Sequence, residues 1–293
     1  MELADLPLHI RPASQHWPEE LRTIDAPPES LWLRGQVEVL APAKRVALVG
    51  SRSPTPYGEA QARRFARALA ENGVVVVSGY ARGIDQAAHR AALEAGGRTI
   101  AVLGNGVARP WPECELLPRI LAEGLFLSEH APEEAPRPHH FPLRNRLISA
   151  LSSAVLVIEA AHASGSLITA RWAADQGREV FALPGRVDHP MARGCHRLLR
   201  EGARLLEDPE EVLADLGLGS QAPEAISQAE RAPDSLVLAE LRGETLTADE
   251  LSRRTHRPLT SVIVELVEAE MAGRVARTPG GLFRLRERSE LSE

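Results

Sequence analysis

Six short runs of apolar residues, many of them β-branched, alternate with longer helix-forming segments between residues 46 and 183. The runs lack the polar alternation of half-exposed strands, so we expect helices to cover both faces of each strand. This order predicts an α/β fold with a Rossmann-like, doubly wound, mostly parallel sheet. The predicted strands are Val46–Val49, Val74–Val77, Thr99–Leu103, Leu125–Leu127, Ala154–Ile158 and Val180–Leu183. The predicted helices are Tyr57–Asn72, Ile84–Ala95, Leu143–Leu151 and Leu167–Gln176.

The pattern divides the chain into four regions. Residues 1–43 are rich in proline, and we expect them to form an irregular N-terminal extension. Residues 44–216 form the Rossmann-like domain, and residues 217–232 are expected to be a linker. Residues 233–288 read as three helices followed by two short strands, which is the order of a small C-terminal winged-helix domain.

Bulk properties exclude several classes of protein. The net charge of -6 argues against a uniformly basic nucleic-acid binder, although a local patch can still bind phosphates. Cys114 and Cys195 have no metal-ligand spacing, so no disulfide framework or metal site is expected. No cofactor is expected, and neither a secretion signal nor a membrane span is visible. We therefore expect a cytoplasmic protein with no membrane partner.

Two neighbouring predicted strands end in glycine and small polar residues. Gly50–Arg52 follows the first strand, and Ser78–Gly83 follows the second. Backbone N–H groups at a strand-to-helix turn attract anions, and the glycines allow a ligand to approach closely. Each turn alone is equally explained as a structural glycine, but both lie at strand ends where open α/β sheets bind ligands.

A proline-bounded loop, Pro136–Pro142, leads into the next helix and carries an aromatic ring among cations. Phe141 can stack on a base while Arg137, Arg144 and Arg146 hold phosphates. The alternative is that Phe141 fills the sheet edge and the arginines form ion pairs.

Two further strand ends carry polar groups. His162–Arg171 offers another helix N-terminus at which Ser166 could act only as a cap, and Leu183–Arg186 adds positive charge. All five segments follow predicted strands, which places them along one edge of a parallel sheet.

Together these segments resemble the DNA-processing protein A (DprA/Smf) family over about residues 44–215. The resemblance rests on five ordered motifs: Gly50–Arg52, Ser78–Asp85, His140–Arg146, Ser164–Ala170 and Pro184-Gly185. Tyr80 departs from the leucine usual in the family, and Gly104–Glu113 replaces a more regular segment.

The resemblance implies a non-catalytic protein that binds single-stranded DNA. Such a protein protects incoming DNA, forms a homodimer and helps load RecA during natural transformation and recombination. By motif position and charge, the residues expected to bind DNA are Gly50, Ser51, Arg52, Ser78, Gly79, Arg82, Gly83, Arg137, His140, Phe141, Arg144, Asn145, Arg146, Gly165, Ser166, Thr169 and Arg186. The expected mechanism is phosphate binding by N–H groups and arginines, with base stacking on Phe141.

Two alternatives stay open. A related Rossmann-like family hydrolyses nucleoside monophosphates with a PGGxGTxxE loop, but His162–Thr169 lacks that glutamate and leaves Asp85, Glu159 and His162 as isolated candidates. Duplex recognition by the C-terminal domain is disfavoured, because the predicted recognition helix Leu259–Ala272 carries three glutamates.

The dimer interface is less defined by the sequence. The leucine-rich stretch Cys195–Leu206 is a candidate, and it is equally well explained as the last helix and strand of the sheet.

Overall fold

The computed structural model describes residues 6–41, 43–218, 236–241, 244–271, 274–278 and 281–285. The chain divides into two compact units, Met1–Ser220 and Gln221–Glu293. Across the described ranges, no helix has the length and apolar character needed to cross a bilayer. Apart from residues 217 and 218, the linker expected at 217–232 lies outside the described residues.

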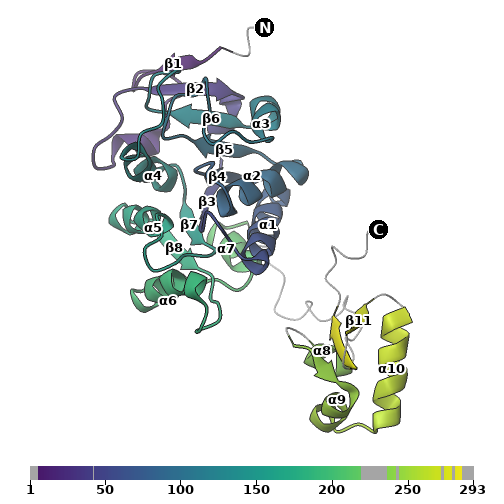
Figure 1. The fold of residues 1–293 in the computed structure, drawn as a ribbon. Coiled ribbons are helices and arrows are strands. Elements are labelled where there is room, and N and C mark those ends of the chain that lie inside the picture. The colour runs from purple at the N-terminus through teal and green to yellow at the C-terminus, as the bar shows by residue number, and fades with distance from the viewer. Residues whose placement is uncertain are drawn as a thin grey trace. The chain divides into compact units, whose positions relative to one another are not determined.

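The first unit is built on a nine-stranded sheet with the order β1-β2-β6-β5-β4-β3-β7-β8-β9 (Figure 1). β3 to β9 run parallel, and the six predicted strands are present to within one residue at each end. This confirms the predicted fold class. The strands are β1 (Leu8–Ile10), β2 (Leu31–Gly35), β3 (Arg45–Val49), β4 (Val75–Ser78), β5 (Thr99–Val102), β6 (Leu125–Ser128), β7 (Ala154–Val157), β8 (Glu179–Ala182) and β9 (Arg204–Leu205).

Helices cover both faces of this sheet because successive strand residues point to opposite sides. Val46 and Leu48 of β3 share a core with α1, α2 and α7, whereas Ala47 and Val49 share one with α4 and α5 (Figure 1). The helices are α1 (Pro56–Glu71), α2 (Ile84–Glu94), α3 (Leu117–Glu123), α4 (His140–Ala150), α5 (Ser166–Asp175), α6 (Arg193–Arg200) and α7 (Pro209–Asp215). Short 3₁₀ helices lie at Glu19–Arg22, Val37–Leu40 and Pro190–Ala192.

The N-terminal segment is part of the sheet, which differs from the irregular extension expected for residues 1–43. β2 pairs antiparallel with β6, and Leu33 lies opposite Leu127 with none of its surface exposed. Arg45 of β3 also forms an ion pair with Glu20. The prolines lie between these short elements and not within the strands. The prolines therefore indicated the turns correctly, but the short strands between them were not predicted.

The sheet has a topological switch point between β3 and β7. From β3 the chain moves outward through β4, β5 and β6, and it then returns to the other side of β3 to form β7, β8 and β9. At such a point the loops after the two central strands turn to opposite faces and leave a crevice at the carboxyl ends. The fold therefore favours a ligand site beside Val49 and Val157.

The second unit has the winged-helix order predicted from the sequence. Three helices pack around a core that includes Leu251, Val262, Leu266 and Phe283. Thr247 and Glu250 form a capping box at the start of α9. The elements are α8 (Leu236–Glu240), β10 (Leu246–Thr247), α9 (Ala248–Thr255), α10 (Leu259–Met271), β11 (Val275–Thr278) and β12 (Leu282–Leu285), with sheet order β10-β12-β11.

We predict that Leu33→Ala destabilises the first unit by about 2–5 kcal/mol, because it leaves a cavity where β2 meets β6. The measurement is urea unfolding followed by tryptophan fluorescence. Leu8→Ala on β1 is the matched control, since Leu8 is 41% exposed and its truncation should change stability by less than about 0.5 kcal/mol. Equal effects of the two substitutions would contradict an integral role for β2.

Candidate functional site

A pocket of about 740 Å³ lies at the switch point predicted by the fold. The loops after β3 and β7 form it together with the loop before α4 and the start of α5. Many of the residues expected to bind DNA meet here, although they are scattered over more than 100 residues of sequence. These residues are Gly50, Ser51, Arg52, Phe141, Arg144, Asn145, Gly165, Ser166 and Thr169.

The loops after β3 and β4 are locked to each other by close backbone approach. A Cβ atom on Gly50 would lie 2.7 Å from Cγ1 of Ile84, so a larger residue does not fit there. Gly83 has φ +81°, which favours glycine, and the next N–H, that of Ile84, donates to the carbonyl of Ser51 at 3.1 Å. This packing leaves Arg52 exposed at the rim of the pocket.

Arg144 lines the pocket from α4, yet its side chain is buried. Its Nη1 donates to the carbonyl of Gly79 at 2.9 Å and to the carbonyl of Val102, which fixes the guanidinium against the ends of β4 and β5. Burial lowers the pKa of Arg144 to about 10, the charge of Asp85 opposes this shift, and Arg52 adds to it. Arg144 stays protonated at neutral pH and carries a positive charge into the wall.

Asp85 is the carboxylate that balances this buried cation. Burial raises the pKa of Asp85 to about 6, and the charge of Arg144 opposes the rise. Hydrogen bonds from the N–H groups of Ala81 and Gly79, at 3.3 and 3.1 Å, also favour the charged form. Arg144 and Asp85 therefore offset one another near neutral pH. Arg52 forms no ion pair with any residue that the structure describes, so its charge is not offset.

Phe141 lies among cations, as the sequence suggested. Its ring centroid is 5.9 Å from the guanidinium carbons of both Arg52 and Arg144. Phe141 is half-buried against Gly104, where a Cβ atom would lie 2.8 Å from the ring. The ring thus packs on the backbone and still lines the pocket.

Trp111 is a pocket residue that the sequence reasoning missed. Its ring centroid lies 5.5 Å from that of Phe141, and the side chain is 46% exposed. The available signal was the sequence Pro110-Trp111-Pro112, which holds a large aromatic residue in a stiff turn where packing does not require it. The pocket therefore presents two neighbouring aromatic rings.

The start of α5 differs in detail from the expectation. Gly165 is the N-cap residue, and Ser166 makes no cap bond with its side chain. Instead, Oγ of Ser164 accepts a hydrogen bond from the Ser166 N–H at 3.3 Å and lies 2.7 Å from the Ser166 hydroxyl. Asn145 donates to the carbonyl of Gly165 at 3.3 Å. The Asn145 amide therefore joins α4 to the start of α5 beside the pocket.

Arg146 does not face the pocket, which corrects its expected position. Its guanidinium forms hydrogen bonds to both carboxylate oxygens of Glu129, at 2.5 and 2.6 Å, and to the carbonyl of Ala26. The side chain is 3% exposed. Residues two apart on a helix point to different sides, so Arg144 and Arg146 cannot share one cleft.

Other expected site residues support the pocket from outside its lining. Ser78 donates to the carbonyl of Leu48, and Gly79 positions Asp85 through its N–H. Gly83 supplies the left-handed turn before α2. His140 is buried, with Nδ1 3.1 Å from the carbonyl of Gly104.

Three exposed arginines also lie outside the lining of the pocket. Arg82 and Arg137 are on the solvent side of their loops. Arg186 forms an ion pair with Asp188 at 2.9 Å, and its side chain is 82% exposed. Their positive charge extends beyond the pocket and does not form its wall.

The three side chains considered for hydrolysis do not form a catalytic group. Glu159 is committed to the start of α1, because it accepts hydrogen bonds from the N–H and hydroxyl of Thr55 at 2.9 and 2.6 Å. Asp85 accepts hydrogen bonds from the N–H groups of Gly79 and Ala81, and His162 is exposed. Within the described part of the chain, no nucleophile beside a base is found among these three residues.

Comparisons with known proteins identify the family. Residues 9–217 match the family of DNA recombination-mediator protein A, and residues 220–281 match the DprA winged helix domain. Protein Smf of Escherichia coli is 41% identical over 95% of this chain and 78% of its own length. DNA processing protein DprA of Bacillus subtilis is 39% identical over 70% of this chain and 69% of its own length.

Two solved structures share the fold. DNA processing protein A from Streptococcus pneumoniae has a TM-score of 0.68 and 40% identity, covering 71% of this chain and 74% of that one. DNA processing protein A from Helicobacter pylori, described for its single-stranded DNA binding mode, has a TM-score of 0.66 and 31% identity. That match covers 72% of this chain and 96% of that one.

We predict that Asp85 makes the stability of the protein depend on pH. Its pKa is about 6 in the folded chain and about 3.9 in an unfolded one, so folding favours its protonated form. The stabilisation is complete below pH 4 and is lost as pH rises through 6. The free energy of unfolding, wild type minus Asp85→Asn, should therefore fall by about 2 kcal/mol from pH 4 to pH 7. A difference that rises with pH would mean that Arg144 outweighs burial.

Proposed function

The chain belongs to the DNA recombination-mediator protein A family, and from this membership we propose that it binds single-stranded DNA in the pocket between β3 and β7. The observation that carries the proposal is the meeting of Arg52, Arg144 and the ring of Phe141 at one topological switch point. An unpaired strand offers both groups that such a site recognises, a phosphate and an exposed base face.

The mechanism follows from how each side chain is held. Arg52 is exposed and has no ion-pair partner among the described residues, so it can exchange solvent for a phosphate at little cost. Arg144 is fixed by two carbonyls, and this holds α4 and its residue Phe141 at the ends of the strands. Phe141 and Trp111 offer ring faces to bases, and stacking on them tolerates any base. Binding should therefore be strong in low salt and weakly selective for sequence.

We further propose that the protein performs no chemistry on the strand. The side chains that a hydrolase would use are occupied by structural hydrogen bonds, as with Glu159 and Thr55, or stand alone, as with His162. Among the described residues, no feature favours nucleoside monophosphate hydrolysis.

The winged-helix unit is an accessory module in this proposal and not a reader of duplex DNA. On α10 the side chains of Ile263, Val264 and Val267 are 43–58% exposed, and Glu268 and Glu270 are exposed beside them. An apolar and acidic helix face repels the phosphates that flank a major groove. The charge of Arg257 is offset by its ion pair with Glu265.

The remaining parts of the proposal rest on the family. We propose a cytoplasmic protein that forms a homodimer, protects incoming DNA and delivers it to RecA during natural transformation and recombination. A dimer would place two DNA-binding pockets close together, so that DNA bound in one pocket meets the second at a high effective concentration. The stretch Cys195–Leu206 contains most of α6 and the strand β9, which is the edge strand of the sheet. Leu205 on β9 is 46% exposed.

We predict that Arg52→Ala weakens binding of single-stranded oligonucleotides about tenfold, because one charge-assisted phosphate contact is lost. The slope of log K against log salt should shrink by about 0.7, the value for one phosphate of a single strand. Fluorescence anisotropy over a salt series, with oligo-dT and a mixed sequence, measures both.

Arg63→Ala is the matched control for the loss of one positive charge. Arg63 lies on α1 and pairs with Glu94 at 2.8 Å, away from the pocket lining. Its replacement should change affinity less than about twofold, as expected for a screened distant charge. A normal affinity for Arg52→Ala, or an effect confined to one base sequence, would contradict the pocket assignment.

We predict that Phe141→Leu and Trp111→Ala each weaken binding of single strands by about 1–3 kcal/mol, the usual value of one stacked base. Leucine retains apolar packing against Gly104 but removes the ring, so the effect reports stacking. Phe141→Tyr keeps a ring and should bind within about threefold of wild type. If the leucine and tyrosine variants bind alike, no base stacks at this position.

A further inference from the structure

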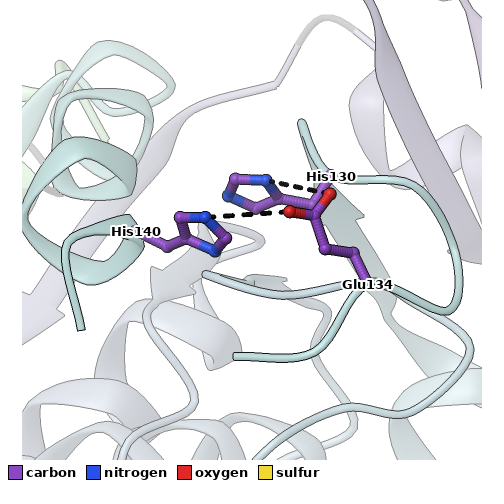
Figure 2. A group of neighbouring side chains, drawn as sticks. All are labelled: His130, Glu134 and His140. Carbon is purple, nitrogen blue, oxygen red and sulfur yellow. Dashed lines mark ion pairs between the residues drawn. The ribbon is translucent and has the colours of Figure 1, made fainter. Parts of the chain in front are cut away.

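Three side chains with metal-binding groups converge near the start of α4, outside the lining of the pocket. His130 and Glu134 come from the loop after β6, and His140 is the first residue of α4 (Figure 2). Their ligand atoms, one from each residue, all lie within 4.8 Å of one another. The spacing H-x₃-E-x₅-H runs through a loop, and no periodic sequence signal marks it.

The hydrogen bonding of His140 turns a free nitrogen lone pair toward a carboxylate. Its Nδ1 lies 3.1 Å from the carbonyl of Gly104, which can only accept, so Nδ1 carries the proton. In the neutral ring, Nε2 then has no proton, and it faces Glu134 Oε1 at 3.7 Å. Nε2 of His140 and Oε1 of Glu134 can therefore both serve as ligand atoms for one metal ion.

His130 repeats this arrangement at the other carboxylate oxygen. Its Nδ1 faces Glu134 Oε2 at 3.7 Å (Figure 2). The rings of His130 and His140 are stacked with centroids 3.9 Å apart. One divalent cation can satisfy all three groups without placing a charge on either ring.

We propose that His130, Glu134 and His140 bind a divalent transition-metal ion, with zinc as the preferred metal. Two imidazoles and one carboxylate form a ligand set typical of zinc, whereas magnesium and calcium favour oxygen ligands. Tetrahedral zinc places its ligand atoms about 3.3 Å apart, so side-chain shifts of about 1 Å close the present spacing.

The surroundings already have the features of a supported metal site. The hydrogen bond from His140 Nδ1 to the carbonyl of Gly104 is of the kind that orients a metal-binding histidine. The Glu134 backbone is fixed at both ends, since its N–H donates to Ala131 and its carbonyl accepts from Gly106 at 2.9 Å. The metal would join this loop to the first turn of α4, one residue before Phe141. Its role is structural, and it does not depend on the proposed DNA binding.

The test uses the full chain after treatment with a chelator and its removal by dialysis. Titration calorimetry with zinc chloride should show one site per chain with a Kd in the micromolar range or tighter, and zinc should raise the Tm by mass action. Both His130→Gln and Glu134→Gln should weaken zinc binding at least about tenfold, because each removes a ligand. Cobalt(II) should give visible absorption bands of a low-symmetry site, and both variants should lose them.

Glu133→Gln and His162→Gln are the matched controls. Glu133 is the neighbouring carboxylate and pairs with Arg109, and His162 is an exposed histidine on another loop. Both controls should bind zinc like the wild type, and circular dichroism without metal verifies that every variant is folded. The proposal is overturned if the wild type binds no zinc at a zinc concentration on the order of 100 μM. It is also overturned if His130→Gln and Glu134→Gln bind as the controls do, since the triad would then be an ion-pair cluster.

Discussion

The rest of the site depends on the hydrogen bonds between the buried guanidinium of Arg144 and carbonyls at the strand ends. A buried charge is costly unless every donor is satisfied and an opposite charge lies near. The carbonyls of Gly79 and Val102 accept hydrogen bonds from Nη1 of Arg144, and the charge of Asp85 favours its protonated form. Because these groups stand at the ends of two parallel strands, Arg144 can be satisfied only when α4 is docked on the sheet edge. The position of α4 then sets the position of Phe141.

The charge of the pocket follows from the same pair. While Asp85 is ionised it offsets Arg144, and Arg52 is left as the cation of the pocket available to a ligand. As Asp85 takes up a proton near its pKa of about 6, the positive charge of Arg144 is no longer offset. The field in the pocket therefore depends on the protonation of a buried carboxylate in the pocket wall. This explains how a chain with a net charge of -6 can hold a local anion site.

The fold was readable from the sequence because its central strands are buried on both faces and leave unbroken apolar runs. The N-terminal strands β1 and β2 were not, since Leu8–Ile10 and Leu31–Gly35 are short and separated by proline-rich turns. For the site, strand ends predicted which loops meet but not where each side chain points. Arg146 was misplaced because its partner Glu129 is 17 residues away and no local pattern links them. Trp111 and the His130 cluster likewise depend on loop paths that periodicity does not encode.

The segment His140–Arg146 concentrates these constraints at one helix start. His140 reaches Glu134, Phe141 lines the pocket, Arg144 binds strand-end carbonyls and Arg146 binds Glu129. Successive helical residues differ in direction by about 100°, so one turn of α4 is held from several sides at once. A helix fixed in this way loses little conformational freedom when a ligand binds, and ordering cost is a main limit on affinity. The buried contacts of α4 thus fix the position of its exposed residues, because they hold Phe141 beside Arg52 before any ligand binds.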